Sequence, residues 1–390
     1  MKIACITTFD LNDPSSWPKR HLGLYGASAQ IARTLQNEET SVDYLGALSR
    51  KRSPVTRLKW LMYRHLFHQD YYSWADPIVS EHYARQIGDK LSCSDADIFL
   101  CQENAIPLAM VQPDRPMVLW TDATLGSLID FYPYLNNLCW ETRRNLLILE
   151  QRVLERCSLI VLTSQWAAQQ AHDLYKVPLS KIKIIPRGSN QSHNLPAEAI
   201  EVAIEQRAGQ RHPCKLLFVG VEWQRKGGDT ALAVATELNR QGLETELHVV
   251  GCVPPVDLPS FVKVYGFIDR TTSAGQLRVA ELFQSAHFLI FPTRADTFGV
   301  VISEAASFGV PALATEVGGI PSVVKADVTG KTFALESNPS EYCQFVMTYI
   351  ADAERYRTLS YSTLKHYRNY MSWPAVGEQA RTAFETLLAT

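Results

Sequence analysis

Short apolar segments alternate with helical segments along most of the chain, and this alternation constrains the fold more than any other feature. The first series of apolar segments reads IACITT, VDYLGAL, IFLCQ, MVLWT, LIVLT and IKIIP. The second reads KLLFVGV, TELHVVG, VKVYGF, HFLIFPT and PALATE, with helical sequences such as DTALAVATELNRQ and AGQLRVAELFQSA between them. Continuous apolar strands that alternate with helices predict parallel sheets covered by helices on both faces. We therefore expect an α/β protein.

A polar stretch separates the two series and predicts two domains. At about 150 residues per domain, a chain of 390 residues has room for two or three. We expect a Rossmann-like, doubly wound N-terminal domain over residues 1–193, a linker over 194–213 with one short helical segment, and a second such domain over 214–372. Two such domains would face each other across a cleft that binds ligands beyond the carboxyl ends of the strands. Residues 373–390 predict a last helix with Pro374 in its first turn.

The composition excludes several classes of protein. The formal net charge of -2 gives no overall attraction to nucleic acid. No apolar run approaches the ~18 residues of a membrane-spanning helix, and the N-terminal sequence MKIACITTFD predicts a strand rather than a signal peptide. The eight cysteines form no Cys-x-x-Cys pair and are expected to be reduced core residues. These features predict a cytoplasmic protein.

Residues 291–321 carry the clearest chemical signal. The sequence FPTRADTFGVVISEAASFGVPALATEVGGIP predicts a buried strand, a turn, and a helix with Thr297 as its N-cap. Such a cap would leave the backbone amides of Phe298 and Gly299 free to bind an anion or electron-rich sugar hydroxyls. Gly318 and Gly319, before a helix at Ile320, predict a second glycine loop beside the first.

Two carboxylates frame this segment. Glu304, about two turns beyond Thr297, can accept two hydroxyls, as a ribose 2',3'-diol requires. Asp296, eight residues before Glu304, lies on the turn and is placed to hold hydroxyls of a donor sugar. A simpler alternative stays open, in which Glu304 is buried and only pairs with a basic neighbour.

A second candidate group for the donor site is the cationic turn at residues 225–226, which precedes a pair of glycines. Lys226, ahead of Gly227 and Gly228, offers a flexible ammonium at a helix start, where a diphosphate would meet a cation and the helix dipole together. For its neighbour Arg225, a phosphate contact and a solvated side chain are equally compatible with the sequence.

These motifs resemble the retaining glycosyltransferases of family 4, which have the two-domain GT-B fold. The D-x7-E spacing from Asp296 to Glu304 is similar to the family's E-x7-E motif, residues 215–228 (KLLFVGVEWQRKGG) resemble its upstream loop, and Pro-Arg-Gly at 186–188 closes the first domain similarly. The resemblance extends over nearly the whole chain. It implies a nucleoside diphosphate sugar as donor, transfer with retention, no metal ion, and a C-terminal helix that packs back on the N-terminal domain.

The sequence departs from the family at two donor-site positions. The first carboxylate is Asp296 rather than Glu, and Val221 follows Gly220 where many members carry a phosphate-binding Arg. Gly220 is included in the expected donor site. We expect Arg225 or Arg187 to supply the missing charge.

The acceptor side carries weaker signals. Gly23 and Gly26 predict tight turns before a helix that starts near Ala27, and the resemblance places this loop beside the acceptor. Asp122 follows the strand MVLWT and is expected either to orient or deprotonate the acceptor hydroxyl, or to cap a helix. The acceptor itself, whether a glycan, a lipid-linked sugar or a small glycoside, does not follow from the sequence.

Residues 49–68 form a basic amphipathic stretch without an acidic residue. Its cations (Arg50, Lys51, Arg52, Arg57, Lys59 and Arg64) interleave with Leu58, Trp60, Leu61, Met62, Leu66 and Phe67. Two interpretations stay open. The apolar stripe packs in the core and the cations are solvated, or the stretch docks on an anionic membrane.

The sequence therefore predicts a metal-independent glycosyltransferase of glycan biosynthesis. Alternatives are a catalytically silent nucleotide-sugar binder, which the departures at Val221 and Asp296 suggest, and another GT-B enzyme such as a sugar-nucleotide epimerase.

Overall fold

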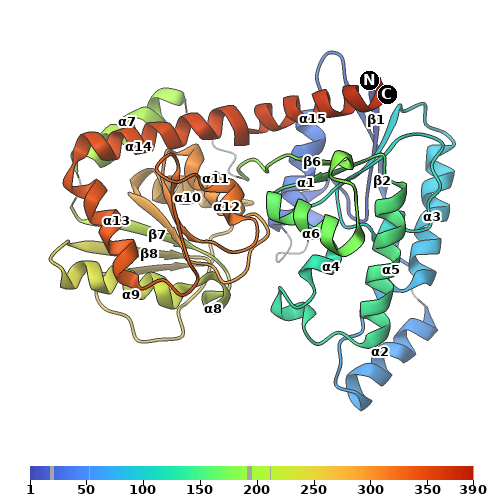
Figure 1. Ribbon diagram of the computed structural model, residues 1–390, viewed down its shortest axis with the longest axis horizontal. Helices are drawn as coiled ribbons and strands as arrows, with labels where there is room; N and C mark the ends of the chain where they lie inside the picture. Colours follow the sequence, from blue (N-terminus) through green and yellow to red (C-terminus); the bar gives the residue numbers. More distant parts are fainter. Residues whose placement is uncertain (18–21, 52, 191–195, 211, 390) are drawn as a thin grey trace. The chain divides into compact units, whose positions relative to one another are not determined.

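Two parallel six-stranded sheets organise the chain in the computed structural model, which describes residues 1–17, 22–51, 53–190, 196–210 and 212–389 (Figure 1). Each sheet is the centre of one unit. Unit 1 comprises Met1–Pro186 and Val376–Thr390, and unit 2 comprises Arg187–Ala375. The expected α/β fold with two doubly wound domains is confirmed.

The sheet of unit 1 contains the first series of apolar segments. Its strand order is β2-β1-β3-β4-β5-β6, and every neighbouring pair is parallel. The central strands β3, β4 and β1 are almost wholly buried, which explains their uninterrupted apolar sequences. The strands are β1 Lys2–Thr7, β2 Ser41–Ala47, β3 Ile98–Cys101, β4 Met117–Trp120, β5 Leu159–Leu162 and β6 Ile182–Ile184.

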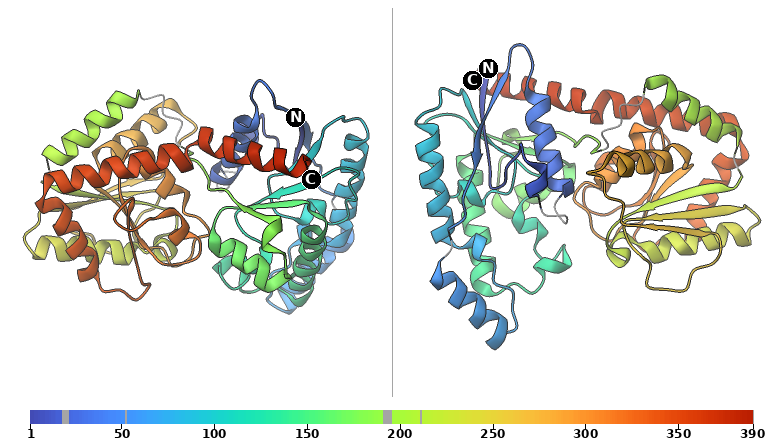
Figure 2. Two further views of the ribbon diagram at one scale, coloured as in Figure 1. Left: turned by 45° about the horizontal axis from the view of Figure 1, so that its top comes forward. Right: turned by 180° about the vertical axis from the view of Figure 1, so that it is seen from behind.

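Helices flank this sheet, and one of them lies apart from it. In Figure 1 and Figure 2, α2 projects from one end of unit 1 beyond the sheet. The helices are α1 Leu22–Leu35, α2 Pro54–Leu66, α3 Pro77–Leu91, α4 Leu125–Leu128, α5 Trp140–Arg156 and α6 Gln165–Tyr175, with short 3-10 turns at Pro14–Ser16, Ser73–Ala75, Ile106–Leu108, Pro133–Leu135 and Leu179–Lys181.

The sheet of unit 2 contains the second series. Its order is β12-β11-β10-β7-β8-β9, again all parallel. The edge strand β12 was not expected, because GKTF is short and contains one exposed lysine, Lys331. The strands are β7 Cys214–Val219, β8 Thr245–Val250, β9 Val262–Gly266, β10 Phe288–Phe291, β11 Ala312–Thr315 and β12 Gly330–Phe333.

Eight helices and a π-helical turn complete the described part of unit 2. They are α7 Ala197–Gly209, α8 Trp223–Lys226, α9 Gly228–Arg240, α10 Ser273–Ser285, α11 Val300–Ser307, α12 Ile320–Val323, α13 Pro339–Ala351 and α14 Ala353–His366, with the π turn at Tyr367–Met371.

The segment expected as a linker differs from that expectation. Its helix α7 belongs to unit 2, where the buried guanidinium of Arg207 donates to the carbonyls of Gln284 (2.7 Å), Phe308 (2.9 Å) and Gly309 (3.2 Å) and to the Tyr356 hydroxyl (3.2 Å). A buried guanidinium needs several acceptors, and these come from α10, the end of α11 and α14. The expected boundary at residues 193–194 lies outside the described residues.

The last helix, α15, spans Trp373–Leu388, as the sequence predicts. Its residues from Val376 onward belong to unit 1, where Arg381 donates to the carbonyl of Thr34 at 2.7 Å. Gly377 packs on the same carbonyl, since a Cβ there would lie 2.4 Å from that oxygen.

The eight cysteines are all free thiols. Six are buried, as expected of core residues, but Cys93 is exposed and Cys252 is partly exposed, so the expectation does not hold for these two. Across the described ranges, no helix combines the length and apolar character needed to cross a membrane.

Candidate functional site

A buried ion pair lies at the carboxyl ends of β7 and β10. The ammonium of Lys226, at the end of α8, contacts Oδ2 of Asp296, which follows β10. The side chains are only 16% and 11% exposed. Lys226 also lies 4.8 Å from the ring centroid of Phe291, a cation–π contact that adds to its attraction to this place. The structure thus brings together two of the predicted site residues.

The second oxygen of Asp296 binds the turn that follows. Oδ1 accepts hydrogen bonds from the amides of Gly299 (2.9 Å) and Phe298 (3.4 Å). Burial alone would raise the pKa of Asp296, but the charge of Lys226 and its hydrogen bond lower that pKa below the usual value. Asp296 is therefore ionised and fully engaged with the protein.

This arrangement corrects the prediction for the helix start. Thr297 is buried but is not the N-cap, because the N-cap residue is Gly299, which is left-handed with φ of 76°, and no side chain caps the helix. The helix α11 begins at Val300. The amides of Phe298 and Gly299 were expected to be free, and instead they donate to Asp296.

The two glycine loops lie side by side, as the sequence predicts. The amide of Gly319 donates to the carbonyl of Asp296 at 3.1 Å, and that of Ile320 donates to Val317 at 3.1 Å. A Cβ on Gly299 would lie 2.7 Å from Cδ1 of Ile320, so this close approach requires glycine. Gly318 is left-handed, with φ of 52°.

The start of α11 offers other amides to a ligand. Within the ranges that the structure describes, the amides of Val300 and Val301 have no acceptor, whereas that of Ile302 donates to Gly299 at 2.8 Å. Unpaired amides at a helix start are suited to an anion. The unpaired amides of this helix are therefore two residues later than the sequence suggested.

Two glycines give Lys226 its position. A Cβ on Gly220 would lie 2.8 Å from Cγ of Lys226, so glycine lets the lysine side chain lie across the end of β7. Gly227 has φ of 79°, and a Cβ there would lie 1.8 Å from the carbonyl oxygen of Pro292. Any larger residue at these two positions would displace the Lys226 turn.

Arg225 is not the solvated side chain that one of the two interpretations expected, since its side chain is only 15% exposed. Its guanidinium pairs with both oxygens of Glu222 (2.9 and 2.7 Å) and donates to the carbonyl of Ala295 at 2.9 Å. Its own carbonyl accepts from the amide of Arg294 at 2.8 Å. Arg225 therefore fastens α8 to the Asp296 turn. Val221, which precedes α8, is 64% exposed.

Glu304 has a basic partner that the sequence did not reveal. Its Oε1 accepts from Nη1 of Arg270 at 2.8 Å, and the Glu304 side chain is 4% exposed against 33% for Arg270. Arg270 lies between β9 and α10, far from Glu304 in the sequence. Its place after the end of a strand was the one sequence signal that could have identified it as a site residue. Pairing with a basic neighbour, the simpler alternative, is present.

Arg187 is buried beside the same helix. Its carbonyl accepts from the hydroxyl of Ser303, next to Glu304, at 3.0 Å. The following Gly188 packs on the ring of Trp373, whose Nε1 donates to the carbonyl of Ser189 at 2.7 Å.

In unit 1, Asp122 follows β4 as predicted, and its carbonyl accepts from the hydroxyl of Thr163 at 3.0 Å. The turn after it is held by Glu150, a carboxylate that the sequence did not single out. Glu150 accepts from the amides of Leu125 (2.7 Å) and Gly126 (2.9 Å) and from the hydroxyl of Tyr175 (2.6 Å). Burial nevertheless raises its pKa to about 7.

The predicted turns at Gly23 and Gly26 are absent. Both residues lie inside α1, which begins at Leu22 rather than near Ala27. Tyr25 on this first turn stacks on Phe9 at 3.6 Å, and this packing outweighs the weak helix propensity of two glycines. Next to Phe9, the hydroxyl of Thr8 donates to Glu103 at 2.8 Å, and burial raises the pKa of Glu103 to about 7.

Comparison with known proteins connects this geometry to a class of enzymes. Residues 213–352 match the family model described as glycosyl transferases group 1. The sucrose-phosphate synthase of Thermosynechococcus elongatus superposes over 100% of both chains with a TM-score of 0.67 and 17% identity. The chain has the GT-B fold. Another GT-B structure, Anabaena HepE in complex with UDP-glucose, superposes over 99% of this chain and 100% of its own with a TM-score of 0.60 and 17% identity.

Sequence relatives of this GT-B chain are glycosyltransferases too. The D-inositol 3-phosphate glycosyltransferase of Nocardia farcinica is 22% identical over 250 residues, which is 61% of this chain and 55% of the relative. The chain thus spans about half the length of the curated relatives it matches. Among the residues described, no group of three or more His, Cys, Asp or Glu side chains is arranged to hold a metal ion.

Proposed function

We propose that this chain transfers a glycosyl group from a nucleoside diphosphate sugar to a hydroxyl acceptor, with retention of configuration. One observation carries the proposal. The Lys226–Asp296 pair and the start of α11 lie together beyond the carboxyl ends of β7 and β10, where glycines allow the Lys226 turn and the two glycine loops to pack closely. Ligands of doubly wound sheets bind beyond these strand ends.

The donor diphosphate is assigned to the cations and amides of this site. The Lys226 ammonium and the amides of Val300 and Val301 would stabilise the leaving diphosphate as its charge increases. Lys226 would exchange or share its contact with Asp296 when the donor binds. Asp296 would then hold hydroxyls of the donor sugar, close to the glycine loop at residues 318–319.

The ribose is assigned to Glu304. Its Oε1 is bound to Arg270, so Arg270 fixes the orientation of the carboxylate toward the diol. The ribose contact and the pairing with a basic neighbour, the two interpretations of Glu304 from the sequence, can then both hold, since the same carboxylate can pair with a cation and accept a hydroxyl. The buried Arg187 would act through α11, because its carbonyl binds Ser303.

The reaction would be a front-face substitution. The bond between the anomeric carbon and the β-phosphate oxygen breaks, and its electron pair leaves with the diphosphate. The acceptor oxygen forms the new bond on the same face and releases its proton to the leaving phosphate oxygen. Lys226 and the amides supply the electrostatic stabilisation, so the proposal requires no metal ion, and full activity in EDTA is the expected result.

The acceptor is assigned to unit 1. Asp122, just before the turn that Glu150 holds, is proposed to orient the acceptor hydroxyl. A lipid-linked acceptor is favoured over a soluble one, because residues 49–68 are proposed to contact an anionic membrane surface.

A second candidate is a nucleotide-sugar binder without transfer activity. The engagement of both Asp296 oxygens with protein groups favours it, because a donor sugar would have to share these oxygens with Lys226 and the amide of Gly299.

A donor screen tests both candidates. Thermal unfolding is followed with UDP-glucose and with other nucleoside diphosphate sugars, and release of the nucleoside diphosphate is measured in parallel. We expect a stabilising shift and slow hydrolysis, both lost in Lys226→Met and kept in the control Lys263→Met on β9, away from the proposed donor site, where the Lys263 ammonium donates to the carbonyl of Ser260. No shift with any donor would overturn the donor site, and saturable binding without hydrolysis would favour the silent binder.

A further inference from the structure

The helix α2 turns an apolar stripe toward solvent. Leu58 and Leu66 are 68% and 73% exposed, and the remaining exposed apolar side chains of the helix lie between or beside them: Val55, Trp60, Leu61 and Met62, followed by Phe67. The interpretation that packed this stripe in the core is therefore wrong. An apolar helical face without a protein partner is unusual on a stable surface and marks an interaction site.

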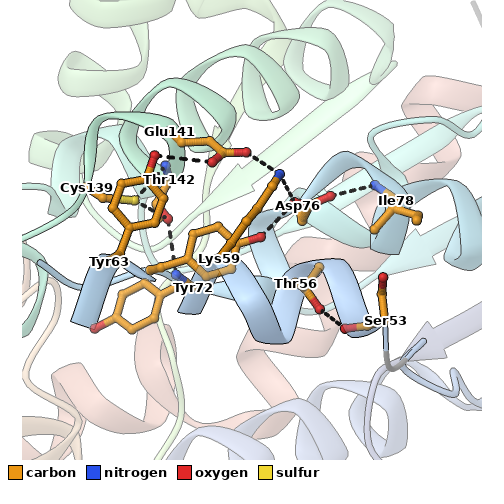
Figure 3. A network of polar contacts seen from close by, with 11 residues as sticks. Ser53, Thr56, Lys59, Tyr63, Tyr72, Asp76, Ile78, Cys139, Glu141 and Thr142 are labelled. Carbon is orange, nitrogen blue, oxygen red and sulfur yellow. Dashed lines mark hydrogen bonds and ion pairs between the residues drawn. The ribbon is translucent and has the colours of Figure 1, made fainter. Parts of the chain in front are cut away.

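The opposite face holds α2 rigidly on unit 1 (Figure 3). There Lys59 binds Oδ2 of Asp76 at 3.0 Å and also binds Glu141, while the hydroxyl of Tyr63 donates to Glu141 at 3.4 Å. Tyr63 also stacks on Tyr71 at 5.7 Å. Because Lys59 and Tyr63 are one turn apart, they fix the rotation of the helix, and the stripe of Leu58, Leu61 and Met62 must face outward.

A cationic pocket lies at the start of the same helix. Its cavity of about 860 Å³ is lined by Arg50, Lys51, Arg57 and Trp60, with Ser53, Pro54, Thr56 and Ser73. The guanidinium of Arg50 donates to the hydroxyl of Ser73, which holds it at the rim. Beyond the pocket, Arg64 lies over the Trp60 ring at 5.1 Å. Arg52 lies outside the described residues.

The charge of this surface is not cancelled by its surroundings. Residues 49–68 contain no acidic side chain. The carboxylates of Asp76 and Glu141, which lie under α2, both pair with Lys59 on the inward face of the helix, not with the outward cations. The arginines and Lys51 are thus left for an external anion, directly beside an apolar stripe. An anionic head group joined to an apolar tail fits both features.

We propose that α2 and its pocket form the docking surface for a bilayer that contains anionic phospholipids. The stripe of Leu58, Leu61 and Met62 enters the interface between head groups and acyl chains. The pocket of Arg50, Lys51 and Arg57 binds a lipid phosphate. This inference rests on the proposed function, because the bilayer would carry the lipid-linked acceptor. The residues of the docking surface are separate from those of the donor site.

Vesicle co-sedimentation tests the proposal with the full chain. Vesicles of phosphatidylcholine alone are compared with vesicles that also contain phosphatidylglycerol. We expect binding only to the anionic vesicles, and weaker binding as salt screens the cations. Arg50→Ser with Arg57→Ser should lower the partition coefficient about 30-fold, at about fivefold per charge near the surface. Leu58→Ser with Leu61→Ser should lower it at least about tenfold, since two apolar side chains no longer enter the interface.

Matched controls remove the same kinds of side chain elsewhere on unit 1. Arg85→Ser changes an exposed arginine of α3, and Leu174→Ser changes a half-exposed leucine of α6. Both should bind vesicles as the wild type does. All variants should keep the wild-type thermal unfolding midpoint and the wild-type shift with the donor, so loss of lipid binding is separated from misfolding and from failure of the donor site.

Three results would overturn the proposal. Equal binding to both kinds of vesicle would show that no anionic head group is recognised. Wild-type binding by the Arg50/Arg57 and Leu58/Leu61 variants would place the contact elsewhere. A dimer in the absence of lipid that Leu58→Ser dissociates would assign the stripe to a second copy of the chain.

Discussion

Replacing Lys226 with methionine should destabilise the protein most strongly near neutral pH. Methionine keeps the length and the contact with the Phe291 ring but removes the charge that Asp296 faces. Asp296 would then be a buried carboxylate whose remaining partners are the amides of Gly299 and Phe298.

The geometry sets the size of the effect. Removing one partner of a buried ion pair costs about 3–5 kcal/mol, and the retained amide bonds reduce this, so we expect about 3 kcal/mol of lost unfolding free energy. Adding Asp296→Asn to the variant should restore most of it, because the amide oxygen still accepts from Gly299 and no charge is left buried.

The pH dependence should change sign in the variant. In the wild type, the lowered pKa of Asp296 gives stability that is present above its ordinary pKa of 3.8 and is lost as the pH falls through the lowered value. Without Lys226, burial is opposed only by the charge of Arg225 and the amide of Phe298, so we expect that pKa to lie above 3.8. The cost of the substitution should then shrink between about pH 7 and about pH 4, as the buried carboxylate takes up a proton.

Urea unfolding of the wild type, both single variants and the double variant, at about pH 7 and about pH 5, measures these quantities. Differences between variants at one pH cancel the titration of other groups. A cost below about 1 kcal/mol for Lys226→Met, or a cost that is the same at both pH values, would refute the buried ion pair as the organiser of this turn.

Three further outcomes are expected. Glu304→Gln should weaken donor binding about tenfold, because a charge-assisted hydrogen bond to the ribose is lost, while the unfolding midpoint stays unchanged. Wild-type affinity in an isothermal titration would contradict the ribose assignment. Gly227→Ala should cost several kcal/mol and abolish donor binding, because its Cβ would overlap the Pro292 carbonyl at 1.8 Å; a wild-type melting curve would contradict this. Because burial raises the pKa of Glu150 to about 7, its contribution to stability should be present below about pH 4.5 and lost as the pH rises to about 7. Over that range the wild type should lose about 3 kcal/mol of unfolding free energy relative to Glu150→Gln, as measured by urea unfolding. Parallel pH profiles of the two proteins would contradict the raised pKa.

The strands were predictable because parallel strands buried on both faces leave a continuous apolar run in the sequence. The strands β3, β4, β10 and β11 are wholly buried, and each was visible. The edge strand β12 was missed, since GKTF has an exposed lysine and too few apolar residues.

The site was predictable in its parts rather than in its contacts. The positions of the glycines identified both loops, because segments of backbone that pack closely against each other require glycine at the points of contact. The pairs Lys226–Asp296 and Arg270–Glu304 join residues far apart in the chain, and no local pattern encodes them. The same limit explains the helix start. Thr297 is a good N-cap residue by type, but Asp296 binds the amides of Phe298 and Gly299, and the helix begins only after Gly299.

The orientation of α2 could not be predicted from the sequence either. An amphipathic sequence shows that a helix has two faces, but not which face meets the protein. Here Lys59 and Tyr63 decide it, through partners on α3 and α5 that the segment itself does not contain.

The four hydrogen bonds of the Arg207 guanidinium bear on how unit 2 can be isolated. A fragment cut to the matched family region, residues 213–352, would lack α7 and α14 and so both Arg207 and Tyr356. The carbonyls of Phe308 and Gly309 would lose their donor, and Ile204 would no longer cover the Gly309 turn. Such a fragment should aggregate on expression, whereas residues 187–375 should give a monomer that remains in solution and retains the donor site.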